Sequence, residues 1–295
     1  MFRLQGVTVK MGKEVALFPL TWEIRRGKIY GIVGSDGAGK TTLIKTLVGL
    51  VKPTSGQLSL DRGTRIGFVP EHFGLYEEMS IAENILFTAS LNGVAADVAQ
   101  ERMPSLLELT GLAPYSDRLA RSLSGGMKRK LAMICAMIHE PGCFILDEPT
   151  NGVDPVSRRE IWQLIRTYRD KGATVIVSTQ YLDEVIHCDE VLFLHQGRML
   201  MADAPKRILE QFPYEVWALK KMRQVPLSEM REFREISGVV ELFQRGTDWI
   251  AYVNGSADLR ESAAQRGYRL ERIPPLVEDV LIRLIKEGAI HDTTV

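Results

Sequence analysis

The chain contains little cysteine and no long apolar run. Only 3 of its 295 residues are cysteine, and no stretch reaches the roughly 18 consecutive apolar residues of a membrane-spanning helix. The cysteines, Cys135, Cys143 and Cys188, lie in apolar stretches without the Cys and His spacing of a metal site. The N-terminus carries no cleavable signal. We therefore expect buried free thiols in a protein of the reducing cytosol, and neither a disulfide-rich secreted domain nor a membrane-spanning one.

The sequence also lacks an excess of charge of either sign. Lys and Arg together number 37, as do Asp and Glu, so the formal net charge is +0 at pH 7. Such a balance produces no strong field, and nucleic acid is not favoured as a partner. What is present is the composition of an ordinary globular protein, with 45% hydrophobic and 25% charged residues. The length predicts one large or two modest domains.

A glycine-rich loop is the most informative feature. Residues 34–41 read G-S-D-G-A-G-K-T, which matches the phosphate-binding pattern G-x-x-x-x-G-K-S/T. The glycines let backbone N–H groups point into one cup, the lysine reaches the β- and γ-phosphates, and the threonine hydroxyl ligates Mg²⁺. An apolar strand over 30–33 precedes the loop and a helix over 42–48 follows it, so the phosphates are expected at a helix N-terminus. The predicted nucleotide contacts are Gly34, Ser35, Asp36, Gly37, Ala38, Gly39, Lys40, Thr41 and Thr42.

Two adjacent carboxylates form a second motif. The apolar stretch 143–146 predicts a buried strand, and Asp147 and Glu148 follow it directly. With a phosphate-binding loop upstream, Asp147 is suited to hold Mg²⁺, and Glu148 to orient or deprotonate the water that attacks the γ-phosphate. An acidic turn after a buried strand is the alternative interpretation.

A third motif, Ser124-Gly125-Gly126, lies between the other two. The serine offers a hydroxyl, the glycines allow close backbone approach, and the basic amphipathic helix that follows has an N-terminus that favours anions. We interpret this motif as a second γ-phosphate binder. One chain has no use for two such binders on one nucleotide, which predicts a head-to-tail pair in which each chain's loop faces its partner's Ser-Gly-Gly. A plain turn is the alternative.

Two domains are expected from the order of the elements. Alternating apolar positions predict antiparallel strands first, then strands and helices alternate as in a mostly parallel α/β sheet with a helical insert. Ser80 and Asp97 are placed as helix caps in that insert. Further on, the order strand, helix (227–236), two strands, helix, strand predicts a small ferredoxin-like α+β domain. The predicted domains are 1–210 and 211–295.

In this order the motifs resemble those of the ATP-binding subunits of ABC transporters. The resemblance covers about residues 1–210 and includes the signature at 123–127 and the loop Asn151–Asp154. The whole chain looks like the drug-exporter branch with ABC-2-type membrane partners, and like the first nucleotide-binding half of its two-half members. The fold implied is an ABC-type P-loop NTPase with an antiparallel β subdomain and a helical insert at about 72–125. In the family this insert docks on coupling helices of the membrane subunits.

The same resemblance implies the ligands and partners. They are ATP and Mg²⁺, ABC-2-type transmembrane permease subunits, and a second ATPase domain in a homodimer or heterodimer. It also implies a peripheral position at the cytoplasmic face of the membrane. The expected function is to power an efflux transporter through nucleotide-driven closure of the dimer.

Three positions depart from the family's pattern. Glu71 stands where the family usually has a Gln that ligates Mg²⁺, so an oxygen ligand is kept and a negative charge is added near Glu148. Gln180 stands where a switch histidine contacts the γ-phosphate, and Met11 stands near the aromatic residue that stacks on adenine. These changes represent either neutral drift or a weakened site that pairs with a non-identical ATPase.

Two rivals to this function stay open at this point. One is a non-transport relative acting on ribosomes or chromosomes, although the chain shows no tandem nucleotide-binding domain, long coiled-coil insertion or basic tail. The other is a regulatory nucleotide-binding subunit with little or no hydrolysis of its own. Intact Lys40, Asp147 and Glu148 argue against the second rival, whereas Glu71 and Gln180 argue for it.

Overall fold

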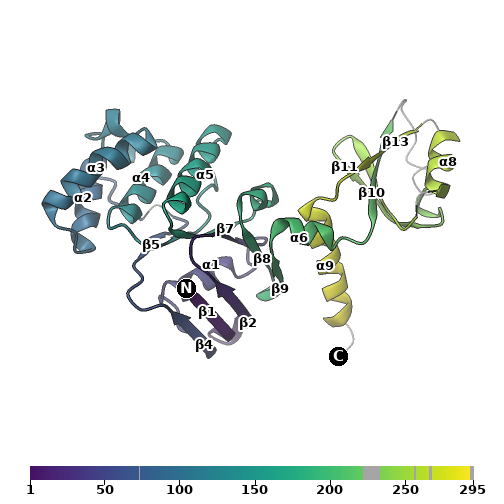
Figure 1. Cartoon of the computed structure of the whole chain (residues 1–295), viewed down its shortest axis with the longest axis horizontal. Coiled ribbons are helices and arrows are strands. Elements are labelled where there is room, and N and C mark those ends of the chain that lie inside the picture. Colours follow the sequence, from purple (N-terminus) through teal and green to yellow (C-terminus); the bar gives the residue numbers. More distant parts are fainter. Residues whose placement is uncertain (73, 222–232, 256, 266–267, 293–295) are drawn as a thin grey trace. The chain divides into compact units, whose positions relative to one another are not determined.

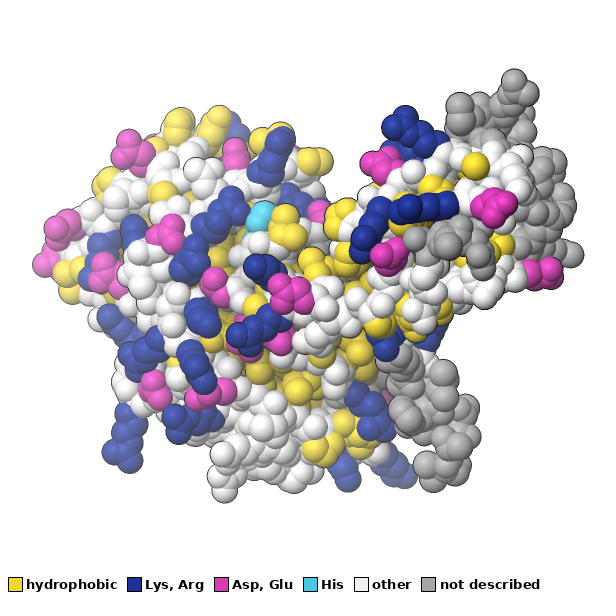
Figure 2. Space-filling model, turned by 45° about the vertical axis from the view of Figure 1, so that its right-hand side comes forward, with side chains coloured by type: hydrophobic (Ala, Val, Ile, Leu, Met, Phe, Trp, Pro, Cys, Tyr) yellow, Lys and Arg dark blue, Asp and Glu magenta, His cyan; other side chains and the backbone are white. Residues whose placement is uncertain are grey.

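The chain forms two compact units (Figure 1). The computed structural model describes residues 1–72, 74–221, 233–255, 257–265 and 268–292. The first unit comprises Met1–Pro205 and the second comprises Lys206–Val295. In the described part of the chain, no helix has the length and apolarity needed to cross a membrane. On the face that Figure 2 shows, acidic and basic side chains of the first unit lie interspersed.

A three-stranded antiparallel sheet opens the first unit. Its strands are β1 (Phe2–Met11), β2 (Glu14–Ile24) and β4 (Ser55–Leu60), in the order β2-β1-β4. Inward-facing positions alternate with solvent-facing ones along β2, as expected for a sheet that covers a core on one face. The antiparallel β subdomain predicted from the alternating pattern is confirmed.

A six-stranded sheet forms the centre of the first unit. Its order is β5-β6-β7-β3-β8-β9, and all neighbours are parallel except the antiparallel β8 and β9. Every residue of β3, β6 and β7 is buried, because helices and the small sheet cover both faces. The strands are β5 (Ile66–Val69), β6 (Cys143–Leu146), β7 (Thr174–Thr179), β3 (Ile29–Val33), β8 (Glu190–His195) and β9 (Arg198–Asp203).

The parallel register brings distant loops together at one edge of this sheet. Val33 pairs with Thr179, Leu146 with Val177, and Val69 with Leu146. The segments that follow β3, β5, β6 and β7 therefore all emerge at the carboxyl ends of the strands, where open α/β sheets bind their ligands.

Helices cover this sheet and build the insert. Helix α1 (Lys40–Leu47) follows β3, and α5 (Pro155–Asp170) precedes β7. Helices α2 (Ile81–Leu91), α3 (Ala96–Thr110) and α4 (Gly125–Met137) share a separate apolar core.

The caps of the insert helices agree with one prediction and contradict the other. Ser80 caps α2 in a capping box with Glu83, as predicted. The prediction for Asp97 is wrong, since Ala95 is the N-cap of α3. Asp97 lies in the first turn, where its charge is favourable with the helix dipole.

The second unit has its own antiparallel sheet. Strands β10 (Glu215–Lys221), β11 (Val239–Arg245), β12 (Asp248–Val253) and β13 (Tyr268–Ile273) lie in the order β11-β12-β10-β13. The short α6 (Pro205–Glu210) precedes this sheet, α8 (Ala257–Gln265) lies between β12 and β13, and α9 (Val277–Asp292) follows. The helix predicted at 227–236 falls mostly outside the described residues.

A buried carboxylate joins α9 to the second unit's sheet. Asp279 is fully buried, accepts hydrogen bonds from Tyr252 Oη at 2.6 Å and from the backbone N–H of Leu276 at 2.7 Å, and pairs with Arg245. Three donors around one carboxylate offset its desolvation. The start of α9 is therefore held on the sheet by polar contacts as well as by Val277 and Val280.

Candidate functional site

The glycine-rich loop adopts a conformation that its glycines make possible. It connects β3 to α1, and Gly37 and Gly39 have φ angles of 76° and 103°, in the left-handed region that other residues rarely adopt. A Cβ atom at Gly34 would lie 2.4 Å from the carbonyl oxygen of Leu194. No side chain caps the N-terminus of α1, so its first N–H groups are left to the loop and to a ligand.

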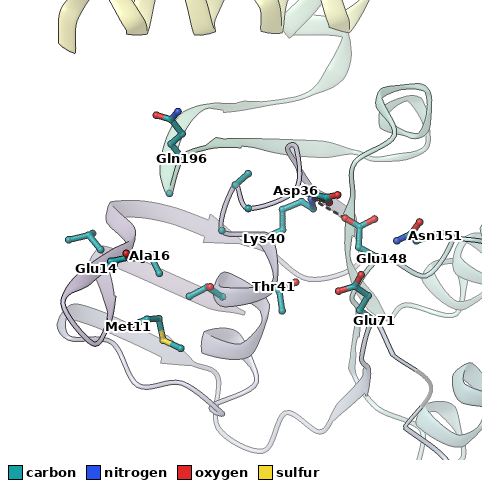
Figure 3. Close-up of a pocket in the computed structure, with 16 residues that line it drawn as sticks. Met11, Glu14, Ala16, Asp36, Lys40, Thr41, Glu71, Glu148, Asn151 and Gln196 are labelled. Carbon is teal, nitrogen blue, oxygen red and sulfur yellow. Dashed lines mark ion pairs between the residues drawn. The ribbon is translucent and has the colours of Figure 1, made fainter. Parts of the chain in front are cut away.

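A cleft of about 690 Å³ opens beside this loop (Figure 3). Of the predicted nucleotide and metal contacts, ten line it: Met11, Asp36, Gly37, Ala38, Gly39, Lys40, Thr41, Thr42, Glu71 and Glu148. The other predicted residues, all in the described part of the chain, do not line it: Gly34, Ser35, Asp147, Gln180, Ser124, Gly125 and Gly126. Residues brought in from elsewhere complete the wall: Glu14, Val15, Ala16, Asn151, Gln196 and Gly197.

Lys40 is held at the centre of the site. Its Nζ donates to the carbonyl oxygens of Gly34 at 2.7 Å and Ser35 at 3.0 Å. It also lies 3.0 Å from Glu148 Oε1 and 4.0 Å from Asp36 Oδ1 (Figure 3). The side chain is only 6% exposed. A buried ammonium fixed in this way presents its charge at one point of the phosphate-binding loop.

A serine on β7 contacts both residues of the acidic motif, the carboxylate of Asp147 and the backbone N–H of Glu148. Ser178 Oγ donates to Asp147 Oδ1 at 2.6 Å and accepts from the backbone N–H of Glu148 at 2.8 Å. The Thr41 hydroxyl lies 3.4 Å from the same Asp147 oxygen. Sequence reasoning did not identify Ser178, since its position depends on the pairing of β6 with β7.

The oxygen donors Thr41, Asp147 and Glu71 fit Mg²⁺. Mg²⁺ is typically held by one or two carboxylates together with substrate phosphates and water. Within the described residues, no cluster of three or more His, Cys, Asp or Glu side chains is arranged to hold a metal ion by itself. This donor set therefore suits a hard ion that arrives with phosphates, and not a self-contained metal centre.

Glu148 has an unusual backbone and an altered acidity. Its φ angle of 49° is in the left-handed region, a conformation that costs of order 1–3 kcal/mol and persists where the surroundings impose it. Burial raises the pKa of its carboxyl, although Lys40 and the backbone N–H of Gln180 both act to lower it. A higher pKa makes the carboxylate a stronger base.

The backbone of Gln180 lies close to this base, but its side chain does not line the cleft. Gln180 follows β7, and the next residue, Tyr181, donates its N–H to Thr179 Oγ1 at 3.0 Å. Glu184 accepts from the same threonine hydroxyl at 2.6 Å and pairs with Arg158 at 2.6 Å. This network fixes the segment around Gln180 next to Glu148.

The Ser-Gly-Gly motif begins α4, away from the chain's own cleft. Ser124 caps the helix by accepting from the backbone N–H of Met127 at 3.3 Å. Ser124 and Gly125 are exposed, whereas Gly126 is buried against α5. A Cβ atom at Gly126 would lie 2.3 Å from Ser157 Oγ and 2.8 Å from Ser157 Cβ. The two glycines therefore have different reasons to be glycine.

We expect Gly126→Ala to destabilise the first unit by about 1–3 kcal/mol, because the added methyl group must displace Ser157. Gly125→Ala is the matched control, since its nearest neighbour would be the Gly152 carbonyl oxygen at 3.9 Å. Urea unfolding of both variants and of Gly126→Ala/Ser157→Gly measures this. The double variant should be more stable than the sum of its single changes. Equal losses at both glycines would contradict the packing argument.

Comparisons with known proteins agree with this geometry. Residues 17–151 match the family model described as ABC transporter. The chain is 41% identical over 205 residues to the probable multidrug ABC transporter ATP-binding protein YbhF of Escherichia coli (strain K12), covering 66% of this chain and 36% of that protein. It is 30% identical over 301 residues to the Nod factor export ATP-binding protein I of Ralstonia nicotianae, covering 95% and 92% of the two chains.

A solved structure gives the same answer for the fold. The dimeric, post-hydrolysis structure of the ATP-binding cassette MJ0796 with ADP and Pi superimposes with a TM-score of 0.62 at 25% identity, over 69% of this chain and 98% of that one. The predicted ABC-type P-loop fold of the first unit is thereby confirmed. The chain belongs to the ABC transporter family, as one of its ATP-binding ATPases.

Proposed function

We propose that this ATPase powers export through an ABC-2-type transmembrane permease, from the cytoplasmic face of the membrane. The observation that carries the proposal is the convergence of Lys40, Thr41, Asp147 and Glu148 around one phosphate-binding loop. The names of the relatives support the direction of transport, since one is a Nod factor export protein and the other a probable multidrug transporter protein.

The residues in and beside the cleft that carry polar groups have separate roles in the proposed cycle. Lys40 and the loop N–H groups bind the β- and γ-phosphates, and Thr41, Asp147 and Glu71 would hold Mg²⁺. When bound, Mg²⁺ neutralises charge on the β- and γ-phosphate oxygens. Glu148 accepts a hydrogen bond from the attacking water and takes its proton. Ser178 bonds the backbone of Glu148 and the carboxylate of Asp147, and so fixes the two residues relative to each other.

We further propose that two ATPase domains close head to tail on ATP. The exposed Ser124 and Gly125 of one domain complete the cleft of the other, as a homodimer or as a heterodimer with a non-identical ATPase. The dimeric structure of MJ0796 supports pairing as such. The boundary near residue 210 and a ferredoxin-like accessory domain over 211–295 belong to the same proposal, supported by the strand order β11-β12-β10-β13.

The chain's own cleft is proposed to turn over slowly. Met11 lines the cleft but is 57% exposed. It would therefore give the adenine ring a flexible apolar contact, where an aromatic residue would give a rigid stack. Glu71 adds a carboxylate beside Glu148 (Figure 3). Gln180 is uncharged, so its hydrogen bond to the γ-phosphate would be weaker than that of a protonated histidine. A faster cleft on a non-identical partner, completed by this chain's Ser124, would then drive transport.

Gln180→His tests the weakened site. We expect steady-state ATP hydrolysis by the purified chain to rise about tenfold, since replacing a neutral by a charged hydrogen bond is worth about 1–1.5 kcal/mol. Gln163→His, an exposed change on α5 that does not line the cleft, is the matched control and should leave the rate unchanged. A native chain that hydrolyses ATP rapidly and gains nothing from Gln180→His would disprove the weakened site. ATP binding with no turnover in either variant would favour the regulatory subunit.

A further inference from the structure

We propose that Arg129, on α4, is the counter-charge that allows a carboxylate to stand at position 71 in the nucleotide cleft. Arg129 is thereby a positioning residue for Glu71. This inference rests on the proposed ATP and Mg²⁺ site and adds to it a residue from the helix that begins with Ser124.

Glu71 lies in the cleft without a direct cationic neighbour among the described residues. It follows β5 and lines the cleft beside Glu148 (Figure 3). Glu148 is paired with Lys40 at 3.0 Å, and Asp147 accepts from Ser178 at 2.6 Å. Among the described residues, no Lys, Arg or His nitrogen forms an ion pair with Glu71 within 4.0 Å. Three carboxylates at one site repel one another unless positive charge lies close to all of them.

Arg129 supplies positive charge next to Glu71. Its Nη1 donates to the carbonyl oxygen of Pro70 at 3.1 Å, which fixes the guanidinium beside the residue that precedes Glu71. Within the described part of the chain, Arg129 forms no ion pair, so its charge is not taken up by a surface carboxylate. Burial lowers the pKa of the guanidinium, and the negative charges of Glu71, Asp147 and Glu148 oppose that effect, with Glu71 contributing most of the three.

The neighbouring cations of α4 differ in this respect. Lys128 pairs with Glu77 at 2.5 Å, and Lys130 pairs with Glu160 at 2.8 Å. Both partners are surface carboxylates that do not line the cleft. Arg129 is therefore the cation of this helical turn that contacts the segment leading to Glu71, and Lys130 is a suitable control.

Electrostatics predicts whether each substitution raises or lowers the affinity for nucleotide. Arg129→Gln leaves the site one unit more negative and should weaken the binding of an anionic nucleotide complex. Glu71→Gln with Arg129→Gln restores the original net charge, and Arg129→Lys keeps it. If Arg129 only held the Pro70 carbonyl in place, its loss would have the same effect whether residue 71 were Glu or Gln.

The test is a double-mutant cycle on the full chain, with Mg²⁺ and the non-hydrolysable analogue AMP-PNP as the probe. We expect Arg129→Gln to weaken binding roughly tenfold in the native chain but by no more than a few-fold in the Glu71→Gln chain, and Arg129→Lys to stay within a few-fold of the native chain. Lys130→Gln should have no effect. Equal losses from Arg129→Gln in the native chain and in the Glu71→Gln variant would overturn the inference.

Urea unfolding of the four chains of the cycle without nucleotide gives a second readout. Arg129→Gln alone should lower the midpoint, and adding Glu71→Gln should restore it. Additive midpoints would again overturn the inference. If the native chain failed to bind Mg²⁺ and AMP-PNP while the unfolding cycle still showed coupling, the proposed function would fall and the electrostatic coupling of Arg129 to Glu71 would stand.

Discussion

Glu148→Gln is expected to lower the rate of ATP hydrolysis by about a hundredfold or more, while ATP binding changes by no more than a few-fold. The substitution keeps the shape of the side chain but removes its capacity to take a proton from water. Lys40, Thr41 and the loop backbone are left as they are, and these groups bind the phosphates. Single-turnover hydrolysis, with ATP binding measured in parallel, separates the two effects.

The pH dependence of hydrolysis provides the control for the role of Glu148 as the base. Only the ionised carboxylate is a base, so the rate should fall as pH falls through the pKa of Glu148. Because burial raises that pKa, this acid limb should lie above the ordinary carboxyl value of 4.5. The limb should be absent from Glu148→Gln and present in Glu14→Gln, whose side chain lies elsewhere in the cleft. A rate unchanged by Glu148→Gln would rule out a base at this position.

Much of the cleft was predictable because its chemistry is local in sequence. The phosphate-binding loop, the Asp147-Glu148 pair and the Ser124 motif each combine their working residues within a few positions. The convergence of the loop with the Asp147-Glu148 pair follows from a simple rule, since the carboxyl ends of adjacent parallel strands meet at one edge of the sheet, whereas the Ser124 motif lies away from the cleft. The motifs and the strand pattern together were sufficient to place most of the catalytic face.

The remaining wall of the cleft depends on tertiary contacts. Glu14 and Ala16 come from the start of β2, and Gln196 comes from the turn between β8 and β9. No periodicity or motif indicates which surface turn will lie beside the loop. Ser178 is similar, because a serine inside an apolar strand gives no sign that it will bond both the Asp147 carboxylate and the backbone N–H of Glu148.

The roles of single residues in the helices also depend on tertiary contacts. Asp97 has the chemistry of a cap, but α3 begins one residue earlier in the chain, at Ala96. The burial of Gly126 against Ser157 is a contact between two helices. From the sequence alone, a glycine needed for such close packing cannot be distinguished from a glycine needed in a flexible loop. A residue type therefore narrows the possible roles, and the neighbour that it meets in space decides between them.

Lys40→Met should reduce ATP affinity on the order of a hundredfold, because charge-assisted hydrogen bonds to the β- and γ-phosphates are lost. It should also destabilise the nucleotide-free chain by up to about 3 kcal/mol, since Glu148 would be left buried without its cation. The double variant Lys40→Met/Glu148→Gln should regain stability but not affinity.

The two losses therefore have separate causes, and isothermal titration with ATP together with urea unfolding distinguishes them. Lys45→Met, an exposed change on the same helix, is the control for both measurements. An ATP affinity within a few-fold of the native value in Lys40→Met would mean that the loop backbone alone binds the phosphates. Failure of Glu148→Gln to restore stability would show that Lys40 acts chiefly through its bonds to the Gly34 and Ser35 carbonyl oxygens. Lys40 contacts both the carbonyl oxygens of the loop and the carboxylate of Glu148, so a single substitution tests both sets of contacts.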